Sequence, residues 1–238
     1  MLKRWRLAGI FAVLVLGGGF ALGQSDDQPR ILTEAEQAGF PAIGLVGYNA
    51  SASSSICTGT LVSADLVLTA AHCVSEEGAV FEATSIYFFA GWRDGKSLAA
   101  VRSKAIVMAQ GAEKKKWSME TDMALVVLEN PIAASLATPI PLAPDAAVAG
   151  LADFISYRRD ARAFAHLAKD CPVIDGDKPV IGLGCSVVTG NSGSPVLQPA
   201  SDGWQIAGVI VSDGSGERGI KAYAVRPNDD IRSKIAQH

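Results

Sequence analysis

Short apolar segments separated by turn residues run through most of the 238-residue chain. They are bounded by Gly, Pro, Ser and Asp, as is typical of strands joined by tight turns. Alternating βαβ units would need helical stretches between the strands, so the pattern predicts an all-β barrel or sandwich. The clearest expected strands are 42–48, 57–62, 66–69, 85–90, 124–128, 180–183, 195–197, 204–211 and 222–225.

Two segments differ from this pattern. Residues 229–237 carry Ile231 and Ile235 four positions apart, which predicts a short C-terminal helix. The Ala- and Pro-rich stretch 131–150 indicates an extended connector between two halves of the chain.

The first residues have the pattern of an export signal. Three basic residues within positions 3–6 precede an apolar run over 7–22, and Ala21 and Gly23 supply small residues for a signal peptidase. We expect residues 1–23 to be a signal peptide cleaved after Gly23, and the protein to be secreted or periplasmic. An uncleaved membrane anchor is the alternative, for which the run is short and rich in glycine. Residues 24–30 would then form a short propeptide or leader.

Charge changes the picture little. Cleavage after Gly23 removes three of the 21 basic residues and none of the 24 acidic ones, which leaves a formal charge of −6. A mildly acidic domain has no electrostatic footprint for nucleic acid. We expect a monomer that, after signal cleavage, binds neither nucleic acid nor a membrane.

The cysteine count agrees with export. Four cysteines in an oxidising compartment predict two disulfides, and nearest-in-sequence pairing gives Cys57–Cys73 and Cys171–Cys185. A zinc site is the alternative. It is disfavoured because no CxxC spacing is present and His72 is the histidine that lies near a cysteine.

Three local patterns carry candidate chemistry, in the order His, Asp, Ser. His72 ends an apolar strand, Asp122 opens another, and Ser192 lies between glycines in Gly190–Pro195. A serine hydroxyl is a weak nucleophile and needs a base, a histidine can accept and return a proton near pH 7, and a carboxylate can fix the tautomer of that histidine. We therefore expect His72, Asp122 and Ser192 to form a catalytic triad.

The glycines beside Ser192 have a role in the same hypothesis. They allow a backbone path that aims the NH groups of Gly190 and Ser192 at one point, where they would stabilise an oxyanion. Each feature alone has an ordinary structural explanation, such as a turn or a strand end. Their joint occurrence favours catalysis, because His166 lies in a polar stretch expected to be exposed and His238 is the last residue.

These motifs resemble the chymotrypsin-like serine peptidases. The resemblance rests on Cys57-Thr58-Gly59-Thr60-Leu61 with Leu68 through Cys73, then Asp122 to Leu125, then Gly190 to Pro195. It implies two six-stranded antiparallel β-barrels with the active site between them, over about 31–138 and 139–238. The Cys57–Cys73 pair matches a disulfide of that family. By the same resemblance Ser212 would lie near Asp122, and Gly214 could pair with the substrate backbone as an extra strand.

The sequence also departs from the trypsin-like zymogens. Arg30-Ile31 looks like their activation site, but Asn191 stands where their aspartate would pair with the new amino terminus. The Gly190-Asn191-Ser192-Gly193-Ser194-Pro195 segment is more similar to the bacterial branch of glutamyl endopeptidases and HtrA-type proteases. We therefore expect an enzyme that does not depend on the trypsin-style switch.

Specificity is less clearly encoded. Ser186 falls at the position that lines the floor of the primary pocket in the family, and an uncharged floor argues against an Arg/Lys preference. Asp213 and Lys221 are charged residues expected near the pocket. The first hypothesis is an apolar or small side chain before the scissile bond, and an acidic preference guided by Lys221 is the second.

The sequence therefore predicts a serine endopeptidase that acts on peptide or protein substrates without a cofactor or metal. Two alternatives stay open. One is a non-catalytic binding protein on the same scaffold, which would show a blocked cleft or a misplaced Gly190 NH. The other is an esterase, which would cleave esters but not proteins.

Overall fold

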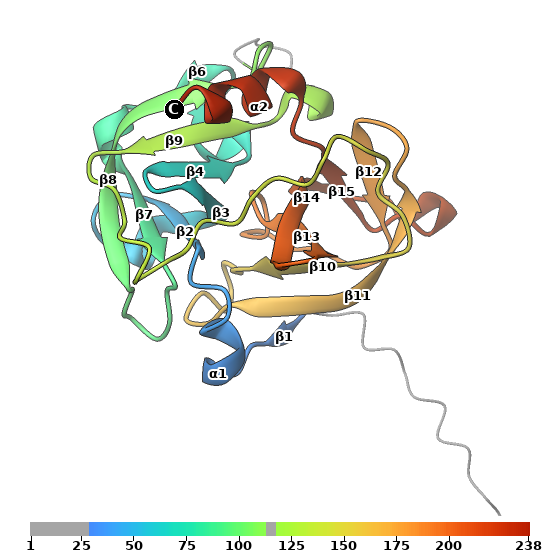
Figure 1. The fold of residues 1–238 in the computed structure, drawn as a ribbon, viewed down its shortest axis with the longest axis horizontal. Coiled ribbons are helices and arrows are strands. Elements are labelled where there is room, and N and C mark those ends of the chain that lie inside the picture. Colours follow the sequence, from blue (N-terminus) through green and yellow to red (C-terminus); the bar gives the residue numbers. More distant parts are fainter. Residues whose placement is uncertain (1–28, 113–117) are drawn as a thin grey trace, which may run out of the picture.

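The computed structural model describes residues 29–112 and 118–238, so the predicted signal peptide at 1–23 lies outside the described part. Its first half is a closed six-stranded antiparallel barrel in the order β2-β3-β4-β9-β8-β7 (Figure 1). The strands are β2 Ile43–Tyr48, β3 Ser55–Ser63, β4 Leu66–Thr69, β7 Ile86–Ala90, β8 Ala99–Met108 and β9 Ala124–Leu128.

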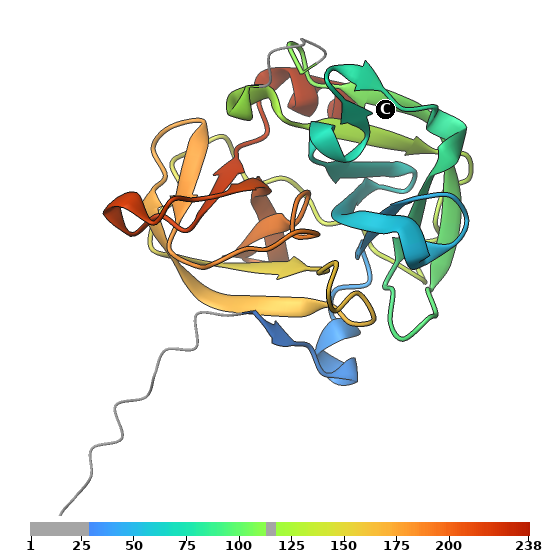
Figure 2. The same ribbon diagram turned by 180° about the vertical axis from the view of Figure 1, so that it is seen from behind.

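The second half forms another six-stranded antiparallel barrel. Its strands pair in the order β11-β10-β13-β14-β15-β12, and β12 pairs back to β11 to close the ring. They are β10 Leu151–Ser156, β11 His166–Asp175, β12 Val180–Leu183, β13 Pro195–Ala200, β14 Gly203–Asp213 and β15 Ala222–Val225. Figure 2 shows the two barrels side by side from behind. The predicted fold class is therefore confirmed.

Both ends of the described chain cross over to the opposite barrel. The short strand β1 (Arg30–Ile31) pairs with β11 of the second barrel, and helix α1 (Glu34–Gln37) follows it. At the other end, helix α2 (Asp229–Ala236) lies against the first barrel, where Lys234 Nζ donates to the Met108 carbonyl at 2.9 Å (Figure 1). These crossings tie the barrels together from both termini.

Small elements complete the chain. The two-residue strands β5 and β6 form a hairpin, and single 3₁₀ turns connect several strands. Their bounds are β5 Ser75–Glu76, β6 Ala79–Val80, η1 Ala52–Ser54, η2 Ala71–Cys73, η3 Ala83–Ser85, η4 Met119–Thr121 and η5 Glu217–Gly219. None of the helices within 29–112 and 118–238 is long and apolar enough to cross a membrane.

Apolar side chains fill each barrel. Phe88 in the first barrel and Phe154 in the second are fully buried. Tyr157 joins the two halves, because it is 1% exposed and its hydroxyl donates to the Trp92 carbonyl at 2.7 Å. Burial raises the pKa of the Tyr157 phenol, so the group stays a neutral donor.

The structure corrects one expectation about a side chain. His166 was expected in an exposed polar stretch, but it opens β11 and is only 3% exposed. Burial also holds the pKa of its imidazole below the ordinary value. The charged residues within 158–162 and at 169–170 misled the prediction, because they flank residues 165–168, which are all buried.

Candidate active site

His72 and Asp122 are brought together by two neighbouring strands. His72 lies in η2 just after β4, Asp122 lies just before β9, and the strand ends pair through Thr69 and Ala124. The His72 Nδ1 atom is 2.7 Å from Asp122 Oδ2, and the His72 backbone NH donates to Asp122 Oδ1 at 2.9 Å. One buried carboxylate thus fixes both the position and the ring orientation of the histidine.

Exposure differs between the two partners in a way that suits proton transfer. The Asp122 side chain is 0% exposed, whereas the His72 side chain is 36% exposed. A carboxylate on Nδ1 favours the tautomer that carries a proton there, which leaves Nε2 as the basic nitrogen. The pair can therefore accept a proton at Nε2 and stabilise the imidazolium that results.

A disulfide holds the histidine turn against β3. Cys73, directly after His72, is bonded to Cys57, and the second disulfide joins Cys171 of β11 to Cys185 after β12. Closing a loop of about 15 residues is worth about 3 kcal/mol in the chain-entropy account. Cys57, His72 and Cys73 also form a compact group of potential metal ligands. The disulfide leaves this group without a thiolate to offer a metal.

The candidate nucleophile lies on a turn between β12 and β13. Strand β3 of the first barrel holds this turn through two hydrogen bonds from Thr58. Thr58 NH donates to the Ser192 carbonyl at 2.8 Å, and Thr58 Oγ1 donates to the Gly190 carbonyl at 3.0 Å. Gly193 has φ +82°, and a Cβ atom there would lie 2.0 Å from the Thr58 carbonyl oxygen. Only glycine allows this close approach.

Thr58 also connects the Ser192 turn to the histidine turn. It follows Cys57, and Cys57 is bonded to Cys73, the residue directly after His72. Within the described residues, no hydrogen bond joins Ser192 Oγ to His72 Nε2. Such contacts are commonly long in ligand-free sites and shorten when substrate binds.

Two backbone carbonyls fix the direction of the candidate oxyanion donors. The Thr189 carbonyl accepts from Arg159 NH at 2.9 Å, and the Asn191 carbonyl accepts from Ser194 NH at 3.1 Å. The described peptides are all trans, so the following NH groups, of Gly190 and Ser192, point away from these anchors. Neither NH has a partner among the described residues, which leaves both available to an incoming oxyanion.

A pocket of about 260 Å³ opens beside Ser192. Its walls combine four apolar residues with polar ones, and Asp213 is the charged residue that lines it. Neither Ser186 nor Lys221 is among the lining residues, which are Val187, Val188, Thr189, Asn191, Ser192, Ile210, Val211, Ser212 and Asp213.

Ser212 and Gly214, the other two residues predicted to bind substrate, have hydrogen-bond partners close to them in the structure. The Ser212 hydroxyl donates to the Asp213 carbonyl at 3.1 Å rather than to Asp122. The Gly214 NH donates to the Lys221 carbonyl at 2.8 Å, so this donor is already used. The Gly214 carbonyl remains as the group that could pair with a substrate backbone.

Sequence reasoning gave no role to Thr58, Tyr157 or Arg159. Thr58 was part of a matched motif, but its contacts with Gly190 and Tyr157 span 132 and 99 residues. No local pattern signals a contact over such separations. A buried threonine in an apolar strand was the available clue, since a buried hydroxyl is expected to have a hydrogen-bond partner.

Comparisons with known proteins agree with this fold. The family model described as Trypsin matches residues 32–156. A solved structure titled "Structure of Glu endopeptidase in complex with MPD" superposes with a TM-score of 0.73 at 18% identity, over 90% of this chain and 97% of that chain. This second likeness shows the fold. No curated protein matches the sequence.

The fold and the site define a chymotrypsin-type serine peptidase. The Trypsin match covers more than half of the sequence, so the chain belongs to the trypsin family. It is a serine-type endopeptidase, and its substrates are peptides or proteins.

Proposed function

We propose that the protein is an exported endopeptidase in which Ser192 is the nucleophile, His72 the general base and acid, and Asp122 the residue that orients the histidine. The observation that carries this assignment is the double contact of Asp122 with His72, through Nδ1 at 2.7 Å and the backbone NH at 2.9 Å. A hydrogen-bonded, buried carboxylate gives the imidazole the tautomer that this chemistry requires.

The reaction follows from these positions. Ser192 Oγ attacks the substrate carbonyl while His72 Nε2 takes its proton, and the carbonyl oxygen becomes an oxyanion bound by the NH groups of Gly190 and Ser192. His72 then gives the proton to the leaving amine, which departs and leaves an acyl group on Ser192. Water then attacks the acyl carbon while His72 Nε2 takes its proton. The ester bond to Ser192 Oγ breaks, the acid departs, and His72 returns the proton to Oγ.

The pocket beside Ser192 supports an apolar or small side chain before the scissile bond. Val187, Val188, Ile210 and Val211 are four of its nine lining residues, and none of the nine is basic. Asp213 at the same pocket is negative, which disfavours an acidic substrate side chain, and Lys221 does not line the pocket. We therefore favour the apolar preference over the acidic one.

We also propose that residues 31–138 and 139–238 work as one peptidase unit outside the cytoplasm. The first range supplies His72 and Asp122 and the second supplies Ser192, so neither half has a complete site. The two disulfides support export, because such bonds persist in oxidising compartments. Loss of the first 23 residues from the exported protein, read by intact mass, tests the proposed leader.

A comparison of two neighbouring serines tests the assignment. Ser192→Ala removes the nucleophile and should lower kcat on an unstructured protein substrate by about 10⁶-fold, without changing the fold. Ser194→Ala is the matched control. Ser194 is fully buried and its hydroxyl has no hydrogen-bond partner in the described chain, so this variant should retain activity. Cleavage by the Ser192→Ala variant at the wild-type rate would overturn the proposal.

A further inference from the structure

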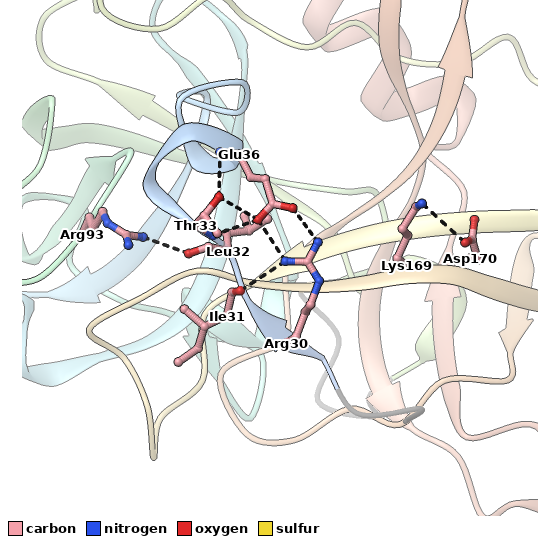
Figure 3. A network of polar contacts seen from close by, with 8 residues as sticks. All are labelled: Arg30, Ile31, Leu32, Thr33, Glu36, Arg93, Lys169 and Asp170. Atoms are coloured by element: carbon pink, nitrogen blue, oxygen red, sulfur yellow. Dashed lines mark hydrogen bonds and ion pairs between the residues drawn. The ribbon is translucent and has the colours of Figure 1, made fainter. Parts of the chain in front are cut away.

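The segment around the candidate cleavage site, Arg30-Ile31, is paired with the second barrel. Arg30 and Ile31 pair with Leu167 and His166 of β11. Figure 3 shows the Arg30 guanidinium turned back onto Glu36, at 2.6 and 2.9 Å. The Ile31 side chain is 50% exposed, so the uncut segment lies on the surface and does not enter the nucleophile turn.

The next residue of this segment, Leu32, is buried in the protein. It is 1% exposed, and Arg93 Nη1 donates to its carbonyl at 3.1 Å (Figure 3). Thr33 and Glu36 form a capping box at the start of α1. The segment is thus ordered with the Arg30–Ile31 bond intact.

The nucleophile turn is held from within by the side chain of Asn191, which is 1% exposed. Its Oδ1 accepts from Val188 NH at 2.7 Å, and its Nδ2 donates to Ser156 Oγ at 2.8 Å and to the Tyr157 carbonyl at 3.0 Å. The amide thus uses its acceptor and both of its donors. A carboxylate at this position could not donate, and its oxygen would face the Tyr157 carbonyl oxygen.

Asn191 is also placed to control both oxyanion donors. It stands between Gly190 and Ser192, and its carbonyl bond to Ser194 fixes the peptide that carries the Ser192 NH. Its side-chain bond to the Tyr157 carbonyl holds the turn next to Arg159, whose NH fixes the peptide that carries the Gly190 NH. No charged group takes part in these contacts.

We propose that Asn191 is the positioning residue of the oxyanion hole, and that its amide keeps this hole formed while the Arg30–Ile31 bond is intact. The inference rests on the proposed function and adds to it. The chain hydrolyses peptides without cleavage at Arg30, because a neutral, fully bonded amide needs no new amino terminus as its partner.

The first test replaces the amide by its isosteric acid. Asn191→Asp removes both donated hydrogen bonds while it keeps size and shape. Losing an oxyanion donor typically costs about 10²–10³ in kcat, so we expect kcat to fall about 100-fold, with KM within about threefold of wild type. A purely structural role would instead lower the amount of folded enzyme and leave kcat per active site, titrated with a fluorophosphonate, unchanged.

Asn228→Asp is the matched control. Asn228 caps α2 through its Oδ1 and Ile231 NH, and aspartate caps helices equally well, so kcat should not change. If Asn191→Asp does not fold, Ser156→Ala replaces it, since it removes one acceptor of the same amide. That variant should lower kcat about fivefold. The inference would be overturned if a folded Asn191→Asp variant had the kcat of wild type. If Asn191→Asp does not fold, the same result for Ser156→Ala would overturn it.

The second test removes the candidate cleavage site. Arg30→Gln in the full-length chain takes away the basic residue before Ile31, and N-terminal sequencing shows whether the bond is intact. We expect the uncut variant to match cleaved wild type in kcat/KM within about twofold. If wild type is active only after cleavage at Arg30, the inference fails and the proposed function stands. If wild type is inactive both cut and uncut, the proposed function itself fails.

Discussion

In the first barrel a buried carboxylate and an imidazole hold each other, whereas in the second barrel the serine turn is held by uncharged amide and hydroxyl groups. Asp122 contacts His72 at 2.7 Å, while Asn191 binds Ser156 Oγ and two backbone groups. The histidine must change its charge in each turnover, so it needs an ionic partner. The oxyanion donors must only keep their direction, and neutral contacts can do this at any pH.

The largest expected effect on activity comes from removing the charge of Asp122 in the first barrel. Asp122→Asn can still accept the His72 backbone NH, but its NH₂ group faces Nδ1 and forces the proton onto Nε2. We expect kcat to fall by about 10⁴-fold in the wrong tautomer. Steady-state kinetics measures the loss, and circular dichroism checks that the fold is retained. An activity above about a tenth of wild type would contradict the assigned role of Asp122.

A smaller effect should come from removing one of the uncharged groups that hold the serine turn. Thr58→Val removes the hydroxyl that links the Tyr157 NH at 2.9 Å to the Gly190 carbonyl at 3.0 Å. The change leaves buried polar groups unpaired, so we expect a loss of about 1–3 kcal/mol in the free energy of unfolding. Urea titration measures this loss, and kcat should fall as well because the turn is loosened.

The matched control for this variant lies two residues further along β3. Thr60 is 1% exposed, and its hydroxyl has no hydrogen-bond partner within the described residues. Thr60→Val should therefore leave stability unchanged or raise it, since an unpaired buried hydroxyl is unfavourable. Equal losses in the two variants would show that packing, and not the Thr58 hydrogen bonds, holds the turn.

The smallest effect is expected at an exposed ionic contact. The hydrogen bond from Arg30 holds the pKa of Glu36 at about 2, below its ordinary value of 4.5. The stabilisation is therefore present above about pH 4.5 and is lost as the pH falls toward 2. Glu36→Gln keeps the capping box, so its melting temperature should lie slightly below wild type at pH 6 and converge with it at low pH. A gap that widens on acidification would contradict this role.

Much of the fold could be predicted because buried strands have a strong pattern. Strands β4, β9, β12 and β15 lie where the apolar segments predicted them. Strands β8, β10 and β11 were missed. β8 has only one buried residue, Ser103, and carries the exposed Arg102 and Lys104, while β11 contains Lys169, Asp170 and Pro172. Charges and proline on solvent-facing positions hide a strand that tertiary pairing still forms.

The candidate site also has a part that the sequence predicts and a part that it does not. His72, Asp122 and Ser192 could be selected because each stands in a recognisable local motif. The partners of Asn191 could not, because Ser156 and Tyr157 lie 35 and 34 residues away in the sequence. The absence of a charge at Asn191 was visible, but the three hydrogen bonds that replace the ion pair depend on the folded barrel.

Covalent labelling of the nucleophile tests the central claim most directly. The oxidised full-length chain would be treated with a fluorophosphonate, digested, and examined by mass spectrometry for the modified residue. The account predicts a single adduct on Ser192, formed at a rate that falls steeply when Asp122 is replaced by asparagine. An adduct on another residue, or no adduct in the folded protein, would contradict it.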